Sequence, residues 1–261
     1  MKVTATRILA IFIFSLISID SYSQNWEKIG KRGEWGSITD VIAMDGFLYS
    51  IEIDGTLYRT DKWGQYQQVG EKGIFQNVQF LVDLNNEIWT IEDGTLYRHN
   101  SSSGNWQAVG VQGEYKNTIA VAALNGKLYS VETNGTLYET NTDGSWRQIG
   151  AYGAFENLEF LVEMEGFLWT VENGTLYKHN INTLESQQVG DVGAWKGTIA
   201  MTGSQAYIWS IDENETLSKT DSDGHYQRIG AIGDMNAVEF IVSLDEFFFI
   251  VENGSLFRIK A

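Results

Sequence analysis

Hydrophobic and polar positions along this chain fall into short runs that repeat six times from Trp26 onward, with a period of about 40 residues that is typical of arrays of equivalent units. In the second repeat, residues 78–84 (VQFLVDL) are apolar on both faces, which is typical of a strand packed between neighbouring units. Residues 87–92 (EIWTIE) and a third apolar run follow across the polar pairs 85–86 and 93–94, which favour tight turns. The segment WQAVG that begins at Trp106 alternates as an outer strand does. Each repeat therefore predicts four short strands.

Six repeats of four strands indicate an all-β protein, and we predict a six-bladed β-propeller. The segment WEKIG at 26–30 has the pattern of an outer strand with no repeat before it, and the sixth repeat ends after its third strand. We therefore predict that the N-terminal strand completes the last blade and closes the ring. An open solenoid is the alternative, but it would need a polar cap at each end, and neither end has that pattern.

The repeats also alternate, which divides the ring into three pairs of blades. The turn before the G-T-L-Y segment is one residue longer in the odd repeats, and the inner strands of the odd repeats carry small residues. The even inner strands carry Phe80, Phe160 and Phe240 instead. Alternating bulky and small strands could fill a narrowing centre, or the alternation could create three equivalent sites rather than six. The sequence leaves both interpretations open.

The segment 1–23 has the composition of an export signal. Basic Lys2 and Arg7 precede an apolar run at 8–19 that is too short to span a bilayer, and small residues lead to an expected cut before Gln24. We therefore predict a signal peptide at 1–23, a propeller domain at 24–261, and a secreted or periplasmic location. The chain contains no cysteine, so its stability must come from the core and from ring closure.

The chain is acidic, with 34 Asp and Glu against 18 Lys and Arg and a formal charge of -16. Nucleic acids and anionic membranes are bound by clustered basic residues. We therefore expect no nucleic-acid partner and no membrane insertion, and solubility is the simplest explanation of the acidity.

The fourth repeat combines W-x-x-I-G, a glycine and an aromatic residue, an F-L-V inner strand, and the segments G-F-L-W and L-Y-K. These positions are Trp146, Ile149, Gly150, Gly153, Phe155, Phe160, Leu161, Val162, Gly166, Phe167, Leu168, Trp169, Val171, Leu176, Tyr177 and Lys178. The combination resembles the blade motif of tachylectin-type β-propeller lectins and, more loosely, tectonin repeats. The resemblance implies a propeller that binds N-acetylated hexosamines, of the GlcNAc or GalNAc type, in clefts between neighbouring blades.

The loop that carries two glycines and an aromatic residue is the candidate carbohydrate site. Glycines let the backbone approach a ligand closely, an aromatic ring can stack on a sugar, and an asparagine can hydrogen-bond its substituents. The candidate residues are Trp35, Phe75, Asn77, Tyr115, Asn117, Phe155, Asn157 and Trp195. The alternative is that the glycines permit positive φ angles and the rings wedge between blades.

One carboxylate recurs at the end of the second strand of every repeat. The column consists of Glu52, Glu92, Glu132, Glu172, Asp212 and Glu252. We predict that each accepts backbone N–H bonds from the following turn. The alternative is a ring of carboxylates at one mouth of the channel that holds a hard cation.

Catalytic patterns are weak in this sequence. Its three histidines, His99, His179 and His225, have no triad or metal-ligand spacing. The acidic residues are distributed symmetrically, which suits repeated binding more than one reaction centre. We predict a non-catalytic, multivalent carbohydrate-binding protein with no cofactor and no metal. A propeller that binds a protein partner through its rim is the alternative, and a glycoside hydrolase is less favoured.

Overall fold

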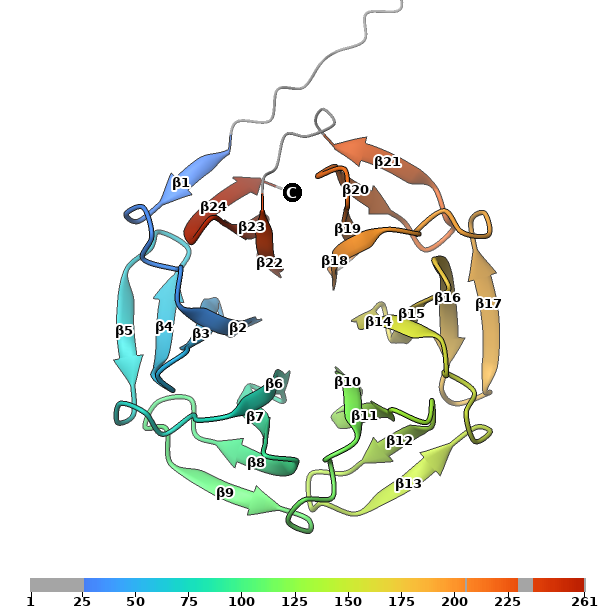
Figure 1. Cartoon of the computed structure of the whole chain (residues 1–261), viewed down its shortest axis with the longest axis horizontal. Helices are drawn as coiled ribbons and strands as arrows, with labels where there is room; N and C mark the ends of the chain where they lie inside the picture. Colours follow the sequence, from blue (N-terminus) through green and yellow to red (C-terminus); the bar gives the residue numbers. More distant parts are fainter. Residues whose placement is uncertain (1–25, 205, 230–236, 261) are drawn as a thin grey trace, which may run out of the picture.

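The computed structural model describes residues 26–204, 206–229 and 237–260. They form six four-stranded antiparallel sheets, arranged as blades around a central channel (Figure 1). The prediction of an all-β, six-bladed propeller is confirmed. The predicted signal peptide at 1–23 lies outside the described residues. Within the described residues, no helix is long and apolar enough to cross a membrane.

In blades 1 to 5 the strands follow one another in chain order from the channel outward, and in blade 6 the N-terminal strand takes the outermost place. The inner strands are β2 (Ile38–Met44), β6 (Val78–Leu84), β10 (Thr118–Leu124), β14 (Leu158–Met164), β18 (Thr198–Gly203) and β22 (Val238–Leu244). The second strands are β3 (Phe47–Glu52), β7 (Glu87–Glu92), β11 (Lys127–Glu132), β15 (Phe167–Glu172), β19 (Ile208–Asp212) and β23 (Phe247–Glu252). The third strands are β4 (Leu57–Asp61), β8 (Thr95–His99), β12 (Leu137–Thr140), β16 (Thr175–Asn180), β20 (Leu217–Thr220) and β24 (Ser255–Lys260). The outer strands are β5 (Tyr66–Val69), β9 (Trp106–Val109), β13 (Trp146–Ile149), β17 (Glu185–Val189), β21 (Tyr226–Ile229) and β1 (Glu27–Ile29). Blade 1 comprises β2 to β5, and blade 6 comprises β22 to β24 together with β1.

The hairpin turns have the chemistry that the sequence indicates. Asn85 and Asn86 join β6 to β7 with φ angles of 59° and 60°, and Asp93 and Gly94 join β7 to β8 with 47° and 72°. Two successive positive φ angles match the right-handed twist of the flanking strands, and asparagine, aspartate and glycine tolerate them best. These turns fix the register that points alternate side chains toward the neighbouring blades.

The N-terminal strand closes the ring, as predicted. Strand β1 pairs with β24 in antiparallel register, with Glu27 opposite Arg258 and Ile29 opposite Leu256. Arg258 Nη2 lies 2.7 Å from Glu27 Oε2, and its guanidinium lies 4.4 Å from the centre of the Trp63 ring in blade 1. These contacts join the two ends of the chain to each other and to the first blade.

The hydrophobic core is divided among the six seams between blades. At the seam between blades 1 and 2, for example, Tyr49 and Ile51 pack with Phe75 and Leu81. Because each blade is apolar on both faces, every blade is buried against two neighbours. A seam is therefore the place where side chains from different repeats meet.

Candidate ligand-binding sites between the blades

The five aromatic side chains predicted to face a sugar are buried at the seams. They are Trp35, Phe75, Tyr115, Phe155 and Trp195, and their exposed fractions run from 1% to 8%. Each backbone N–H donates to the carbonyl of a turn glycine in the preceding blade, as Trp35 does to Gly254 at 3.0 Å. The rings thus lie where the wedge interpretation places them. A ring buried in this way offers no open face for stacking except where it borders a pocket.

The three asparagines of the predicted site lie apart from these rings. Asn77, Asn117 and Asn157 are exposed, and none of them lines a pocket described below. Asn77 Nδ2 donates to Asp93 Oδ2 at 3.1 Å, and the carbonyl of Asn117 accepts the N–H of Thr133. The structure therefore does not bring the rings and the asparagines together around one pocket.

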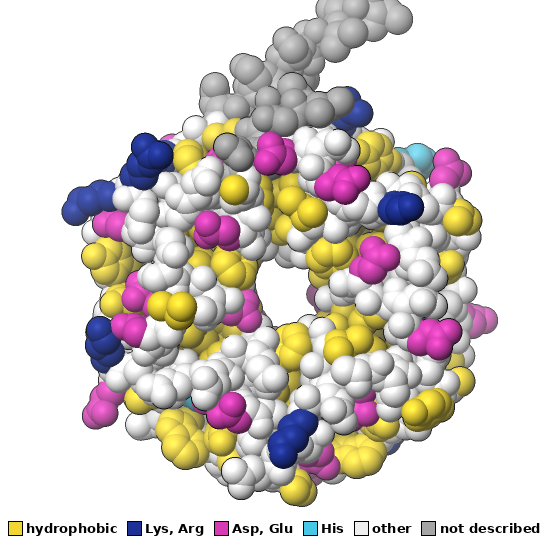
Figure 2. Space-filling model, in the orientation of Figure 1, with side chains coloured by type: hydrophobic (Ala, Val, Ile, Leu, Met, Phe, Trp, Pro, Cys, Tyr) yellow, Lys and Arg dark blue, Asp and Glu magenta, His cyan; other side chains and the backbone are white. Residues whose placement is uncertain are grey.

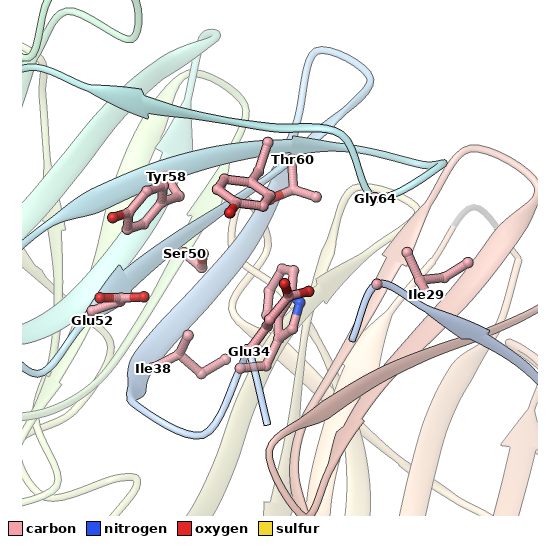
Figure 3. Close-up of a pocket in the computed structure, with 11 residues that line it drawn as sticks. Ile29, Glu34, Ile38, Ser50, Glu52, Tyr58, Thr60 and Gly64 are labelled. Atoms are coloured by element: carbon pink, nitrogen blue, oxygen red, sulfur yellow. The ribbon is translucent and has the colours of Figure 1, made fainter. Parts of the chain in front are cut away.

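A pocket of about 230 Å³ opens at the seam between blades 6 and 1. Every strand of blade 1 contributes a side chain to it, and Figure 3 shows Ser50, Thr60 and Glu34 around one space, with Tyr58 and Glu52 on one side. Its lining residues are Ile29, Gly30, Glu34, Trp35, Ile38, Ser50, Glu52, Tyr58, Thr60, Gly64 and Tyr66. Of the residues predicted to bind carbohydrate, Trp35 lines this pocket.

Two buried residues in this pocket carry hydroxyl groups that have no protein partner among the described residues. Ser50 is 4% exposed and Thr60 is 3% exposed. Within the described residues, no hydrogen bond joins either hydroxyl to another protein group, although both line the pocket. Polar groups in native proteins are nearly all hydrogen-bonded, either to protein or to water. The pair therefore needs a water molecule or a ligand as its partner.

Blade 3 contains a smaller version of the same pocket, with a volume of about 120 Å³. Its lining residues, each two repeats after a lining residue of the first pocket, are Glu114, Tyr115, Thr118, Ser130, Glu132, Tyr138, Thr140 and Trp146. Here Tyr115 Oη lies 3.1 Å from Thr140 Oγ1, and Trp146 Nε1 donates to Glu114 Oε1 at 2.5 Å. The polar groups of this pocket thus satisfy one another to a larger extent.

In blades 2 and 4 a histidine occupies the corresponding space. By strand register, His99 takes the position of Thr60, since Ile88 pairs with His99 as Leu48 pairs with Thr60. His99 is 1% exposed, its Nε2 lies 2.8 Å from Thr90 Oγ1, and its ring centre lies 4.6 Å from that of Phe75. Blade 4 repeats the arrangement with His179, Thr170 and Phe155, and blade 6 has Ile250 and Ile259 at the two polar positions.

Blade 5 keeps part of the pocket. Thr220 is buried, and within the described part of the chain Thr220 Oγ1 and Trp195 Nε1 have no hydrogen-bond partner. Ala194 stands at the position of Glu34, and Ser218 stands at the position of Tyr58. The hydroxyl of Ser218 lies 2.5 Å from Tyr226 Oη. Blade 5 therefore has the buried hydroxyl of Thr220 but lacks the loop carboxylate and the third-strand tyrosine that line the pockets of blades 1 and 3.

The recurring carboxylate at the end of the second strand anchors the following turn at one position. Asp212 Oδ1 accepts the N–H groups of Asn214 and Thr216 at 2.9 and 3.1 Å, as predicted. Within the described residues, no group of three or more His, Cys, Asp or Glu side chains is placed to hold a metal ion.

At Glu92 and Glu172 the prediction of a turn anchor is wrong. Glu92 Oε1 accepts a hydrogen bond from Thr90 Oγ1 at 2.5 Å and lies 3.3 Å from His99 Nε2. Glu172 has the same contacts in blade 4, whereas Glu52 lines a pocket. The reason is that the threonine and the histidine of these two even blades lie closer to the carboxylate than the turn N–H groups do.

The pocket in blade 1 is anionic. Burial, reinforced by the charge of Asp54, raises the pKa of Glu52 above its ordinary value. The nearby Lys72 does not line the pocket and pairs with Asp54 at 2.9 Å. Glu34 Oε2 accepts the backbone N–H of Lys31 at 2.7 Å. The pocket thus presents carboxylates and hydroxyls, and no cationic side chain is among its described lining residues.

The central channel has a cavity of about 500 Å³ lined by the inner strands, and Figure 2 shows hydrophobic side chains around its opening. No residue of the carboxylate column lines this cavity. Asp40 does, and its two oxygens accept the N–H groups of Val41 and Leu81 at 2.8 and 2.9 Å. Burial raises the pKa of Asp40 to about 7. Since both oxygens hold backbone groups of adjacent blades, Asp40 joins the seam between blades 1 and 2.

No protein-family model and no curated protein matches this chain. The resemblance to tachylectin-type lectins therefore rests on the repeat motif alone. Among solved structures, the chain is similar to virginiamycin B lyase from Staphylococcus aureus, with 12% identity, a TM-score of 0.59, and coverage of 90% of this chain and 84% of that one. It is also similar to the calcium-binding protein regucalcin from Agrobacterium tumefaciens, with 12% identity, a TM-score of 0.63, and coverage of 89% and 93%. A structure of YCF48 bound to D1 peptide is similar with 12% identity, a TM-score of 0.56, and coverage of 93% and 97%. At such identities the likeness shows the fold alone: this chain is a six-bladed β-propeller.

Proposed function

We propose that this protein binds carbohydrate without catalysing a reaction, and that the pocket between blades 6 and 1 is its principal site. The observation that carries the proposal is the pair of hydroxyls on the buried residues Ser50 and Thr60, which line the pocket and have no protein partner among the described residues. A sugar hydroxyl both donates and accepts hydrogen bonds, so it can satisfy two such groups at once. Trp35 and Tyr66 add aromatic surface against which a sugar ring can pack.

The size of the pocket suits a single sugar ring. Its volume of about 230 Å³ is many times the roughly 10–15 Å³ that a single water molecule needs in the same measure. The seam closes around the innermost part of this space, and the exposed side chain of Tyr66 forms its rim. The site therefore favours a terminal sugar residue, and hexosamines of the GlcNAc or GalNAc type are the first candidates by the resemblance to tachylectin-type lectins.

A catalytic role has weaker support. The nearest approach to a catalytic pair is Ser186 Oγ, which lies 2.7 Å from His179 Nδ1, with Thr170 Oγ1 2.7 Å from the other ring nitrogen. Ser186 is exposed on the outer strand β17 and lines none of the pockets described above. Acyl transfer needs donors that stabilise the oxyanion beside a bound substrate, and nothing in the described geometry around Ser186 supplies them.

A protein partner is the second candidate function, and it is favoured by exposed apolar side chains on the loops that follow the outer strands. Val111, Tyr152 and Val192 are 66%, 71% and 76% exposed, and Ile53, in the adjoining turn, is 80% exposed. Such side chains are candidates for an interface. A secreted or periplasmic location, which the segment 1–23 predicts, is compatible with either function.

Isothermal titration of the pure chain with a panel of monosaccharides tests the proposal. We expect weak binding of at least one sugar by the parent, and loss of the tighter binding in the double variant Ser50→Thr, Thr60→His, which copies the filled seam of blade 2. The matched control is Ser210→Thr, Thr220→His, the same change in blade 5, and it should leave binding as in the parent.

Two results would contradict the proposal. If no sugar binds and the chain instead retains a defined protein partner, the protein-partner function replaces it. If the blade 1 variant binds sugar as the parent does while its melting temperature is unchanged, the pocket is not the site.

A further inference from the structure

We propose that the pocket in blade 1 prefers a sugar with a free amino group, and that the side chain at position 66 sets this preference. This inference rests on the proposed carbohydrate binding and adds the chemical class of the ligand. Equivalent lining positions of the blade 1 and blade 3 pockets carry a glutamate, and the two glutamates differ in the hydrogen-bond donors that they receive.

In blade 3 the glutamate of the loop is fully engaged by protein groups. Glu114 Oε1 accepts a hydrogen bond from Trp146 Nε1 at 2.5 Å, and Glu114 Oε2 accepts one from the N–H of Val111 at 3.3 Å. Both oxygens therefore have donors before any ligand arrives. The negative charge of this carboxylate is stabilised within the protein.

In blade 1 the equivalent carboxylate keeps one oxygen available. Glu34 Oε2 accepts the N–H of Lys31, but Oε1 has no hydrogen-bond donor among the described residues, and the nearest cation there is Lys31 Nζ at 4.0 Å, on a side chain that is 89% exposed. Tyr66 replaces the tryptophan. Its ring packs edge-to-face on Tyr58 with centres 5.8 Å apart, as Trp146 packs on Tyr138 at 5.3 Å. The ring position is thus preserved, and the N–H that would reach the glutamate is lost.

The rest of the blade 1 pocket adds negative charge and, among its described lining residues, no compensating cation. Glu52 lines the same space, and the nearby Lys72 is held by Asp54 at 2.9 Å. Acidic sugars are disfavoured by this field, and a neutral sugar leaves the carboxylates without a counter-charge. An ammonium group supplies both the charge and three donors in one small substituent.

The buried hydroxyls make the ligand a sugar rather than a simple amine. Ser50 and Thr60 have no hydrogen-bond partner in the described part of the chain and lie in the same pocket as Glu34 and Glu52. A sugar ring that carries hydroxyls and one amino group can bond to both the hydroxyls and the carboxylates of this lining. Acetylation of the amine removes the charge and adds bulk, so an unacetylated hexosamine should bind better than its acetylated form.

Titration at pH 7 and low ionic strength, with glucosamine, glucose and N-acetylglucosamine as probes, tests the preference. Because a charge-assisted hydrogen bond is about twice as strong as a neutral one, we expect glucosamine to bind about tenfold more tightly than glucose. Added salt should reduce this difference. Equal or tighter binding of glucose or N-acetylglucosamine would overturn the inference and leave the proposed function intact, whereas failure of all three probes, and of the wider monosaccharide panel, would remove the proposed function itself.

Position 66 provides the matched variants. Tyr66→Trp should give Glu34 the donor that Glu114 has and reduce the ratio of glucosamine affinity to glucose affinity several-fold. Tyr226→Trp is the control, since it makes the same change on the outer strand of blade 5, where Ala194 replaces the glutamate; it should leave the preference unchanged. Equal preference in parent and Tyr66→Trp, or equally tight binding of glucosamine and cyclohexylamine, would overturn the inference.

Discussion

At the scale of single residues, one pair of neighbouring positions at the second and third strands holds different interacting side chains in different blades. In most blades a cation on the third strand lies over an aromatic ring at the start of the second strand. The pairs are Arg59 over Phe47, Lys178 over Phe167, Lys219 over Tyr207 and Arg258 over Phe247, at 4.1 to 4.7 Å. Blade 3 has Lys127 in place of the ring and Glu139 in place of the cation, at 2.6 Å. The two positions have therefore changed together, from a cation–ring contact to an ion pair.

The group around Glu139 gives a prediction for stability and its dependence on pH. Glu139 is 4% exposed and accepts hydrogen bonds from Lys127 at 2.6 Å and from Arg147 and Tyr129 at 2.9 Å. Burial alone would raise the pKa of Glu139, but these bonds outweigh it and lower the pKa to about 2. We expect Glu139→Gln to lower the free energy of unfolding by about 1–3 kcal/mol at pH 7, because charged donors lose their partner.

The sign of the pH effect follows from the lowered pKa. The stabilisation by Glu139 is complete above its ordinary value of 4.5 and is lost as the pH falls toward 2. The difference between parent and variant, measured by urea unfolding from pH 7 to pH 3, should therefore shrink with falling pH. Glu156→Gln, at an exposed position, is the control. A difference that stays constant over this range would contradict the assignment.

The residues of the candidate site show what the sequence could and could not predict. Trp35 and Glu52 were singled out because they belong to columns that recur along the repeats, and both line the pocket. Ser50 and Thr60 were not, because single hydroxyl residues in a strand have no distinctive pattern. The sequence feature that could have identified them is the change from Ser50 and Thr60 in the first repeat to the larger Thr90 and His99 at the equivalent positions of the second. Whether a pocket forms depends on side-chain volume across the seam, which the period alone does not give.

At the scale of strands and turns, the sequence predicted nearly the whole arrangement. Residues 78–84 and 87–92 were predicted as strands and form β6 and β7 with those bounds. The prediction succeeds because each boundary is set by local chemistry, in the asparagine and aspartate–glycine turns with positive φ angles. The prediction that β1 closes the ring rested on counting strands at the two ends, and the register of β1 with β24 confirms it.

Removal of β1 should destabilise the ring strongly. Truncation to a start at residue 31 would expose the edge of β24, remove Ile29, which is 4% exposed, and leave Arg258 without Glu27. Burial of one isoleucine contributes about 1.5–3 kcal/mol, and the lost strand pairing adds to this. We expect a clearly lower midpoint of denaturant unfolding. The control starts at residue 24, retains β1 and should unfold at a clearly higher midpoint than the shorter chain; equal midpoints for the two truncations would exclude closure by this strand.

At the scale of the whole molecule, the pairing of repeats makes neighbouring seams different. The even blades fill the seam with His99, His179 or Ile259, whereas blades 1 and 3 leave open pockets of about 230 and 120 Å³. Bulky and small inner strands alternate around the channel, as the packing interpretation expects. The two described pockets differ in volume, so three equivalent sites stay a prediction. The threefold pattern is incomplete because blade 5 has Ala194 and Ser218 in place of the glutamate and the tyrosine.

The number of binding sites follows from this incomplete pattern. Since described pockets of this kind lie in blades 1 and 3, we expect isothermal titration with glucosamine to give two sites of unequal affinity, the tighter one in blade 1, where Glu34 and both hydroxyls are available. Thr60→His should leave only the weaker site, Thr140→His only the tighter one, and the double variant neither. Two weak sites on one rigid ring would raise the avidity for a clustered glycan by roughly 10²–10⁴ over a single contact. A stoichiometry of three would mean that the buried Thr220 and Trp195 also receive a sugar, and a single site insensitive to Thr60→His would show that these seams are not where the ligand binds.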